Sequence, residues 1–262
     1  MSTWRNEGMF WATCTLFFVG SVIVTTLWCS AMSGMGGMPM PGHWSLSMAW
    51  MPMEGQTWLG LAVSFLAMWT VMMVAMMLPS LVPVLHRCRD AASHVHHQRP
   101  GQLTAWVSVG YFSVWVAFGM VVFVLGVGFA ALAMQQPIVA RAVPVATGVV
   151  VVLAGVLQLT VWKAHQLACC RETSKHLPMN IGSAWRFGLR RGLHCSYCCA
   201  GLTAVLVVNG VMDLGVMTAV TVAITTERLA PGGRRMAQAI GGIVIVLGMG
   251  LIVRGAGWGA FP

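Results

Sequence analysis

Five methionines fall within ten consecutive residues of one apolar segment, MWTVMMVAMM, at Met68, Met72, Met73, Met76 and Met77. Residues three or four apart lie on neighbouring ridges of a helix, so several thioethers would line one side of a helical segment. A thioether is a soft ligand that suits Cu(I). Methionine is also a flexible filler of packed cores, so the spacing alone fits both copper binding and packing.

A second group of methionines occupies the preceding Gly- and Pro-rich segment, residues 32–56, which contains no Lys or Arg. A loop offers no core for long apolar side chains to fill, and a thioether remains a ligand where thiols are oxidised. The segment is therefore interpreted as an extracytoplasmic copper-binding loop, the alternative being an apolar loop that lies on the membrane surface. Its candidate ligands are Met35, Met38, Met40 and His43.

Thiols and imidazoles form a third group, near the predicted cytoplasmic ends of two spans. On a helix, three cysteines of the segment HCSYCC share one face because they stand at positions i, i+3 and i+4. Together with the segment HQLACCR they predict a closed soft-metal site. Buried, inert cysteines and a CxxC redox pair are the alternatives. The candidate ligands are His165, Cys169, Cys170, His194, Cys195, Cys198 and Cys199.

Composition places these groups in a membrane protein. Of the 262 residues 58% are hydrophobic and only 8% are charged, whereas soluble domains carry about 25% charged residues. The net charge of +9 arises mainly from short loops between apolar runs, where Lys and Arg set topology rather than bind nucleic acid. The chain has six carboxylates and no nucleotide-binding or hydrolase motif, so an enzyme is not expected.

The apolar runs predict an all-α polytopic bundle in a single integral membrane domain, residues 1–262. A span is predicted to end at Pro79, and residues 80–102 and 163–192 are predicted to be cytoplasmic loops. The run from Cys195 to Glu227 would make a helix of about 50 Å, longer than the hydrocarbon core of about 30 Å. A break at 211–214 gives seven spans, and an unbroken helix gives six. Because basic residues favour the cytoplasmic side, seven spans with a cytoplasmic N-terminus are preferred.

Several of these segments together resemble a known family. MWTVMMVAMMLPS, AGVLQLTVWK with Cys170 and Arg171, and the block CSYCC…GVMD…ERL are similar to the bacterial family of predicted metal-binding integral membrane proteins, over about residues 57–252. The chain departs from the family pattern at Cys198 and Cys199, which lie in Tyr-Cys-Cys-Ala where the family has Gly-Cys-Cys-Trp. It also has Asp213 after Met212 where the family has Asn. The resemblance implies a multi-pass membrane protein that binds a metal and brings no established reaction.

The function predicted from these features is copper handling at the cell (inner) membrane. Cu(I) would be captured by the methionines of the extracytoplasmic loop. It would then pass along the five methionines between Met68 and Met77 in the second predicted span (the span-two methionines) and reach the cytoplasmic thiols. The predicted partners are the lipid bilayer, a copper donor or acceptor protein and further subunits of a homo- or hetero-oligomer. The alternatives are a membrane thiol–disulfide oxidoreductase that uses Cys195 and Cys198, and a non-catalytic assembly subunit of a membrane complex.

Overall fold

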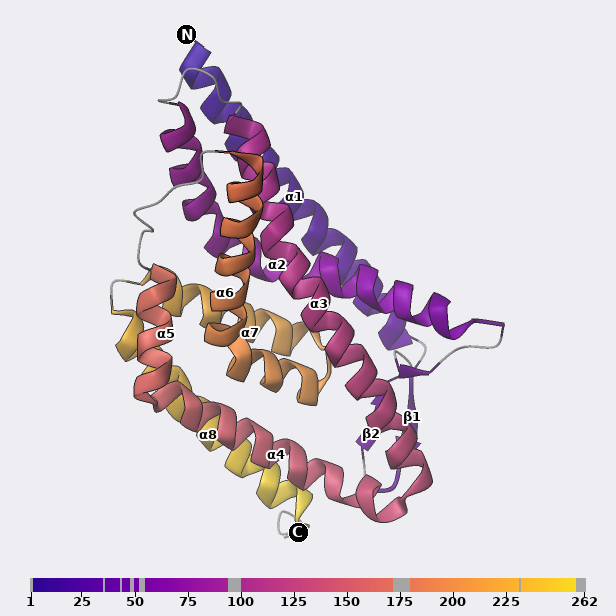
Figure 1. Cartoon of the computed structure of the whole chain (residues 1–262). Helices are drawn as coiled ribbons and strands as arrows, with labels where there is room; N and C mark the ends of the chain where they lie inside the picture. The colour runs from indigo at the N-terminus through magenta and orange to yellow at the C-terminus, as the bar shows by residue number, and fades with distance from the viewer. Residues whose placement is uncertain are drawn as a thin grey trace.

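The computed structural model describes residues 2–34, 36–42, 44–47, 50–51, 55–93, 100–171, 180–230 and 232–257. Over these residues the chain forms a bundle of helices with one small hairpin, which confirms the all-α polytopic prediction (Figure 1). In chain order the elements are α1 (Ser2–Gly34), β1 (Gly37–Met40), β2 (Trp44–Ser47), α2 (Trp58–Ser93), α3 (Pro100–Gln135), α4 (Pro137–Leu159), α5 (Val161–Arg171), α6 (Ile181–Asn209), α7 (Leu214–Leu229) and α8 (Gly233–Gly255).

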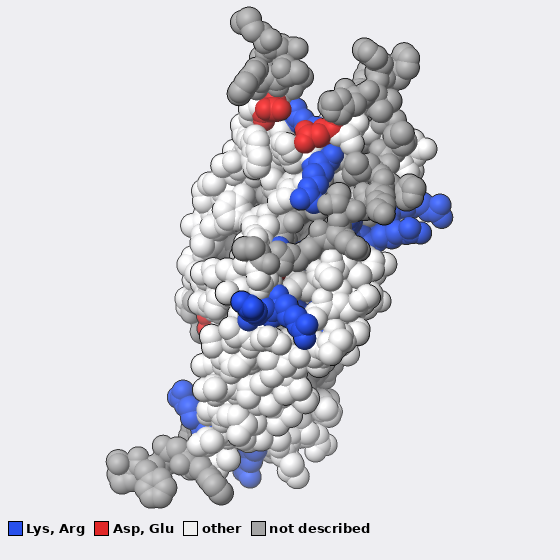
Figure 2. Space-filling view, turned by 90° about the vertical axis from the view of Figure 1, so that its left-hand side faces the viewer, with Lys and Arg blue, Asp and Glu red and all other residues white. Residues whose placement is uncertain are grey.

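Six of the described helices are long and apolar enough to cross a membrane, namely α1, α2, α3, α4, α6 and α8. With 16 residues, α7 rises about 24 Å, which is less than the hydrocarbon core of about 30 Å. In Figure 2 the lower half of the visible face is broad and uncharged, with basic residues at its lower end and in a band at mid-height. These features are compatible with a membrane protein.

The long apolar run after Cys195 is broken where the sequence predicts. Helix α6 ends at Asn209 and α7 begins at Leu214. Gly210 has a φ of 118°, a backbone conformation that favours glycine. Asp213 caps α7 by accepting a hydrogen bond from the backbone N–H of Val216, at 3.0 Å. The polar turn therefore separates two helices, although α7 is too short to count as a seventh full span.

The prediction that Pro79 ends the second span is wrong. Helix α2 continues through Pro79 and Pro83 to Ser93. Proline removes one helical hydrogen bond, but Ser and Thr side chains often satisfy backbone groups beside such a proline in membrane helices. Here the Ser80 hydroxyl donates to the carbonyl of Met77, at 2.9 Å, which adds a contact beside the proline but does not replace the bond that Pro79 removes at the Ala75 carbonyl. Residues 80–93, which were predicted to begin a cytoplasmic loop, are therefore helical and belong to α2.

The predicted loop 163–192 is also largely helical in the described residues. Its first part belongs to α5, and α6 begins at Ile181. The start of α6 is fixed by a reciprocal capping box, in which Asn180 accepts from the Ser183 backbone N–H at 2.8 Å and the Ser183 hydroxyl accepts from the Asn180 N–H at 3.0 Å. The apolar run in the sequence begins at Cys195 and suggested that a helix starts there. In the structure Cys195 is well inside α6.

Two packing arrangements organise the bundle. Helices α4 and α8 lie side by side along their lengths, in the lower part of Figure 1. Their backbones approach closely at glycines, because a Cβ added to Gly155 would lie 2.8 Å from the carbonyl oxygen of Gly241. Helices α2, α3, α6 and α7 instead surround a core of large apolar side chains, which contains the span-two methionines. The soft ligands of the sequence therefore meet within the second arrangement.

Candidate metal centre

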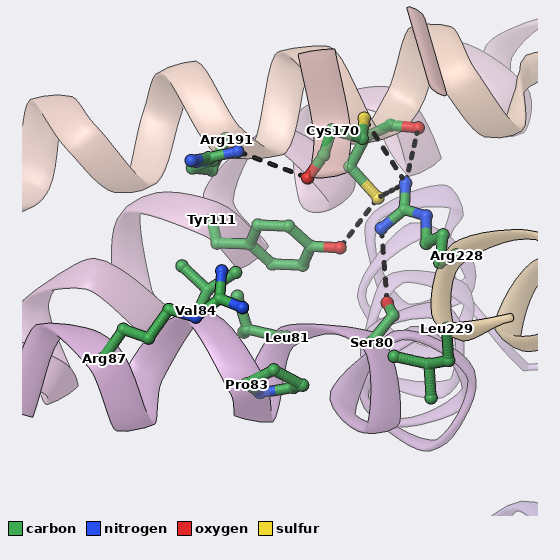
Figure 3. A pocket seen from close by; sticks show the side chains of 11 residues that line it. Ser80, Leu81, Pro83, Val84, Arg87, Tyr111, Cys170, Arg191, Arg228 and Leu229 are labelled. Carbon is green, nitrogen blue, oxygen red and sulfur yellow. Dashed lines mark hydrogen bonds between the residues drawn. The ribbon is translucent and has the colours of Figure 1, made fainter. Parts of the chain in front are cut away.

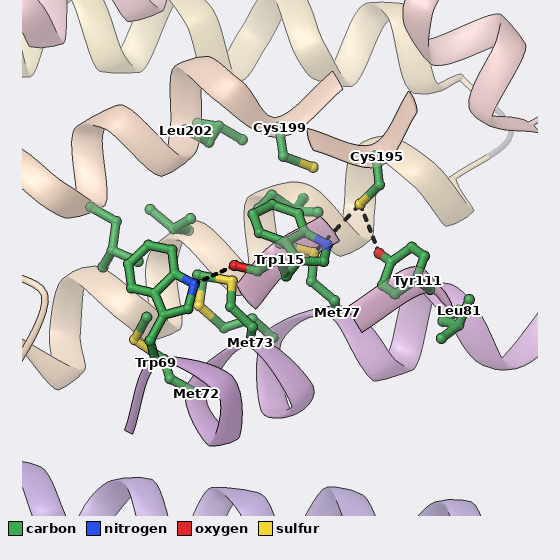
Figure 4. Close-up of a cluster of buried hydrophobic side chains, with 14 of the residues drawn as sticks. Trp69, Met72, Met73, Met77, Leu81, Tyr111, Trp115, Cys195, Cys199 and Leu202 are labelled. Atoms are coloured by element: carbon green, nitrogen blue, oxygen red, sulfur yellow. Dashed lines mark hydrogen bonds between the residues drawn. The ribbon is translucent and has the colours of Figure 1, made fainter. Parts of the chain in front are cut away.

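The five span-two methionines are all buried. Their exposed fractions are 3% or less, and they pack in the main core of the bundle with Trp69 and Trp115 (Figure 4). The Trp69 indole N–H donates to the Trp115 carbonyl at 2.9 Å, which ties α2 to α3 beside Met72 and Met73. Their burial is what we expect if these methionines fill space in the core. Contact with a second soft ligand is what distinguishes one of them, Met77.

Met77 meets a cysteine of α6. The Sδ of Met77 and the Sγ of Cys195 are 3.8 Å apart, and both side chains are buried. Cys198 and Cys199 follow on the same helix and are equally buried. The i, i+3, i+4 spacing therefore places three thiols on an inward surface of α6, as predicted, and Cys195 faces the end of the methionine series.

Arg228, at the end of α7, brings these thiols together. Its Nη2 donates to Cys195 Sγ at 3.0 Å and to Cys199 Sγ at 3.3 Å. The same nitrogen lies 4.0 Å from Cys170 Sγ, and Nη1 donates to the Ser80 hydroxyl at 3.2 Å (Figure 3). One guanidinium therefore contacts sulfur atoms from α5 and α6 and the proline-containing part of α2.

Tyr111 of α3 completes this cluster. Its hydroxyl lies 2.7 Å from Cys195 Sγ, and its side chain is 2% exposed (Figures 3 and 4). Cys195 is thus contacted by a phenol, a guanidinium and a thioether at once. Hydrogen bonds from the phenol and the guanidinium stabilise a thiolate, which is the form that ligates metals, whereas the thioether can only accept. We call Met77, Cys195, Cys199, Tyr111 and Arg228 the sulfur cluster.

Cys170 borders the sulfur cluster from α5. Its thiol donates to the His194 carbonyl at 3.4 Å, and Arg191 holds the same helix end by donating to the Cys170 carbonyl at 3.3 Å. The pKa of Cys170 is raised above its usual value, first by a hydrogen bond with the Cys198 side chain and then by burial. Both effects favour the thiol form of Cys170.

The histidines predicted as ligands lie elsewhere. His165 Nε2 is 3.7 Å from Cys169 Sγ in an exposed i, i+4 pair on α5. His194 contributes its backbone carbonyl rather than its ring to the Cys170 contact and is exposed. Over the described ranges, no three His, Cys, Asp or Glu side chains form a group that could hold a metal. A centre with three or more ligands among these residues would therefore include methionine.

A buried ion pair lies beside the cluster and was not recognised in the sequence. Lys163 Nζ is 2.8 Å from Glu227 Oε2, with the two side chains 3% and 2% exposed. Gln158 of α4 donates to Glu227 Oε1 of α7 at 2.5 Å, so this buried amide forms a hydrogen bond between helices. Lys163 also donates to the Cys198 carbonyl at 2.6 Å. The pair thereby connects α4, α5 and α7 to the thiol-bearing part of α6.

The sequence contained an indication that Glu227 is buried with a basic partner, but it did not identify that partner. Lys163 was counted among topology-setting loop residues, and Glu227 and Arg228 stood at the end of an apolar run. A chain with only six carboxylates that places one at the end of an apolar helix invites a search for its buried partner. The partner is 64 residues away in the chain, so only the fold identifies it.

The described part of the methionine-rich segment 32–56 contains a hairpin, where the sequence predicted a loop. Strands β1 and β2 pair antiparallel, with Met38 opposite Leu46 and Met40 opposite Trp44. Two residues apart on one strand, Met38 and Met40 share a face. The Trp44 indole N–H donates to the Ala140 carbonyl at 2.8 Å and fixes the hairpin to α4. Met35 and His43, also predicted as ligands, lie outside the described residues.

A cavity of about 360 Å³ adjoins the sulfur cluster (Figure 3). It lies among α2, α5, α6 and α7 and is lined on one side by Cys170, Cys195 and Tyr111. Arginines contribute much of the remaining polar lining, and none of the described lining residues is acidic. The cluster is therefore buried but borders a positively charged space.

The fold and the site together define a class of protein, a polytopic helical membrane protein with a buried centre of thiols and a thioether. The comparison with protein families agrees with this class. The family described as PpoB2, copper chaperone, matches residues 66–251, which include the whole sulfur cluster, and the chain belongs to this family. The resemblance found in the sequence covered nearly the same residues under another family name. No curated protein and no solved structure matches the chain.

Proposed function

We propose that the protein binds Cu(I) as cargo at Cys195, Cys199 and Met77 and transfers it to a partner at the cell (inner) membrane. Membership of a copper chaperone family supports a copper-related role. The observation that carries the site is the 3.8 Å approach of the Met77 thioether to the Cys195 thiol inside the bundle. Two soft ligands from distant parts of the chain meet there, where a packed core needs neither.

The sulfur distances suit one shared ion. Metal–sulfur bonds are about 2.3 Å, so two sulfurs on one ion lie about 3.8 Å apart at a tetrahedral angle and about 4.6 Å apart when linear. Met77 and Cys195 already fall at the lower end of this range. Cys199 is one helical turn further on and contacts the same Arg228 nitrogen as Cys195. The proposal requires these side chains to rotate so that the three sulfurs converge on one ion.

Charge balance supplies a second argument. Cu(I) held by two thiolates and a neutral thioether carries a single negative charge, which is costly in a low-dielectric interior unless it is paired. Arg228 donates to both thiols and supplies the compensating positive charge. Cu(I) is also the ion that thiolate and thioether ligands select. The cluster therefore suits Cu(I) better than a hard divalent ion.

The other predicted ligands fit a route to and from this centre. Met68, Met72, Met73 and Met76 precede Met77 along α2, and the outer hairpin carries Met38 and Met40. We propose capture at the hairpin, passage along α2 and retention at the sulfur cluster, followed by transfer at the predicted cytoplasmic end. Cys170 and Cys198 border the cluster and are the next thiols available to the ion.

The proposal is tested by anaerobic Cu(I) titration of the purified protein against a chromophoric Cu(I) chelator. We expect one tightly held Cu(I), and a loss of at least about a hundredfold in affinity for Cys195→Ser with Cys199→Ser, because both anionic ligands disappear. Arg228→Gln should weaken binding and Arg228→Lys should restore part of it, since lysine keeps the charge.

Cys29→Ser is the matched control, because Cys29 is equally buried but lies on α1. Its affinity should equal that of the unaltered protein. Undiminished Cu(I) affinity in the Cys195 and Cys199 double variant, with normal abundance in the membrane, would remove the basis of the proposal.

A thiol–disulfide oxidoreductase remains the enzymatic alternative. Redox cysteines are commonly activated at the start of a helix, whereas Cys195 and Cys198 lie inside α6 and are buried. A reporter fused after Arg191 discriminates the two functions, because an oxidoreductase pair would face the oxidising side. A non-catalytic assembly subunit is the third alternative, and copper content of the purified protein separates it from a copper carrier.

A further inference from the structure

The cavity beside the sulfur cluster has the size and lining of a ligand site. Its volume of about 360 Å³ lies at the lower end of the range of about 300–1,000 Å³ for small-molecule sites. Arg87 of α2, Arg191 of α6 and Arg228 of α7 line it from three sides, together with Tyr111 and Cys195 (Figure 3). Such a lining favours an anionic ligand, because guanidinium groups bind carboxylates with paired hydrogen bonds.

The position of the cavity indicates what the ligand does. Cys195 and Cys170 form part of its wall, so a molecule inside it reaches the thiol that contacts Met77. Arg191 and Arg228 each make contacts that fix their position, to the carbonyls of α5 and to the thiols respectively. A rigid positive wall next to a copper thiol suits a ligand that carries both carboxylates and a thiolate.

We propose that this cavity binds a small anionic thiol, of the size and charge of a carboxylate-bearing tripeptide thiol, which exchanges Cu(I) with Cys195. The inference rests on the proposed copper function and names the carrier class for that site. In the exchange a bond forms between Cu(I) and Cys195 Sγ while the bond between Cu(I) and the carrier sulfur breaks. The thiol proton of Cys195 passes to the departing carrier thiolate. Copper remains Cu(I) throughout, so no oxidant or reductant is needed.

The first experiment measures ligand binding to the cavity in the absence of copper. S-Methylglutathione has the carboxylates of such a carrier but no free thiol, and its dimethyl ester lacks the negative charges. Calorimetric titration of the full-length protein should show saturable binding of S-methylglutathione, and about tenfold weaker binding or none for the ester. Equal binding of the two compounds, or no binding of either, overturns the inference.

Substitutions in the cavity wall test the location. Arg87→Gln should weaken S-methylglutathione binding by about tenfold, and Arg87→Glu should weaken it further because it reverses the charge. Arg87 is preferred to Arg191 here, since Arg191 also holds α5 in place. The control is Arg234→Gln with Arg235→Gln, two exposed arginines at the start of α8 that do not line this cavity. A loss in the control equal to that in Arg87→Gln places the effect outside the cavity and overturns the inference.

The second experiment measures transfer from thiols that differ in charge. Cu(I) complexes of mercaptosuccinate, mercaptoethanol and cysteamine are anionic, neutral and cationic donors. The anionic donor should transfer about tenfold faster than the cationic one, and Arg87→Gln should bring the ratio near one. Fast transfer from all donors, with no binding of S-methylglutathione, overturns the carrier site and leaves the copper site standing. Charge-dependent binding of S-methylglutathione to a protein that takes up no Cu(I) overturns the proposed function and, with it, the exchange.

Discussion

The α4–α8 contact and the sulfur cluster solve helix packing in opposite ways. At the first, glycines allow the two backbones to touch, and a Cβ on Gly248 would lie 2.8 Å from the backbone nitrogen of Val152. At the second, α2 and α6 meet through long side chains, with Met77 and Cys195 between the backbones. The α4–α8 glycine contact carries none of the side chains of the cluster. Glycine also brings α3 close to α6 beside the cluster, where a Cβ on Gly192 would lie 2.8 Å from the Tyr111 carbonyl oxygen. A contact filled by methionine and cysteine side chains holds sulfur atoms between the helices, and a bound ion could take the place of their contacts with one another.

The buried ion pair that joins the two regions should give the largest effect. Glu227→Leu leaves Lys163 buried without its counter-charge, and we expect a loss of about 3–5 kcal/mol in the free energy of unfolding. Membrane abundance and the detergent-solubilised melting temperature measure this loss. Lys163→Met with Glu227→Leu removes both charges and should recover most of it. Equal instability of the single and double variants would show that the charge itself is not the cause.

The glycine contact should give the next largest effect. Gly155→Ala forces a methyl group against the backbone of α8, at 2.8 Å from the Gly241 carbonyl oxygen, and should cost about 1–3 kcal/mol. Gly242→Ala is the matched control, because a Cβ there meets nothing within 4 Å. Cu(I) affinity of the folded fraction should be unchanged in both variants. A Gly155→Ala protein with full stability would contradict the close packing of α4 on α8.

The methionines should show a small effect on stability and a large effect on copper. Met77→Leu conserves volume, so we expect a loss below about 1.5 kcal/mol, with Cu(I) affinity falling at least about tenfold. Met72 and Met76 continue the i+4 series that starts at Met68, so the sequence favours them as the more important pair, and this stays a prediction. Met72→Leu with Met76→Leu is therefore compared directly with Met77→Leu by titration and membrane abundance. Undiminished Cu(I) binding by both variants would assign all the methionines to packing.

The outer hairpin should give the smallest effect on the purified protein. Met38→Leu with Met40→Leu leaves the buried centre intact, so affinity for the tightly held ion should not change. The rate of Cu(I) uptake from dilute solution should fall about two- to threefold if the hairpin captures the ion. Zinc titration provides the control, because thioethers are poor ligands for Zn(II). Tighter zinc than copper binding at the hairpin would exclude a capture role.

Periodic patterns in the sequence predicted those features that depend only on residues close together in the chain. The apolar runs gave the helical bundle, and the turn before Leu214 followed from an over-long run with Asp213 within it. The i, i+4 spacing of the methionines and cysteines gave their shared faces, because helix geometry alone fixes which side chains align. Local signals failed at Pro79, because α2 continues through two prolines within a packed bundle and a single-residue rule does not take such packing into account.

The sequence by itself determined the membrane-type composition, the helical class and the soft ligands available to a metal. Only the tertiary structure decided which of them meet: Met77 with Cys195, and Cys195 with Arg228, one of the basic residues that the sequence assigned to topology. It also separated His165 and Cys169 from the thiols of α6 and paired Lys163 with Glu227. The physical reason is that burial of a charge or a thiol depends on partners from distant segments, and those partners converge only when the helices pack.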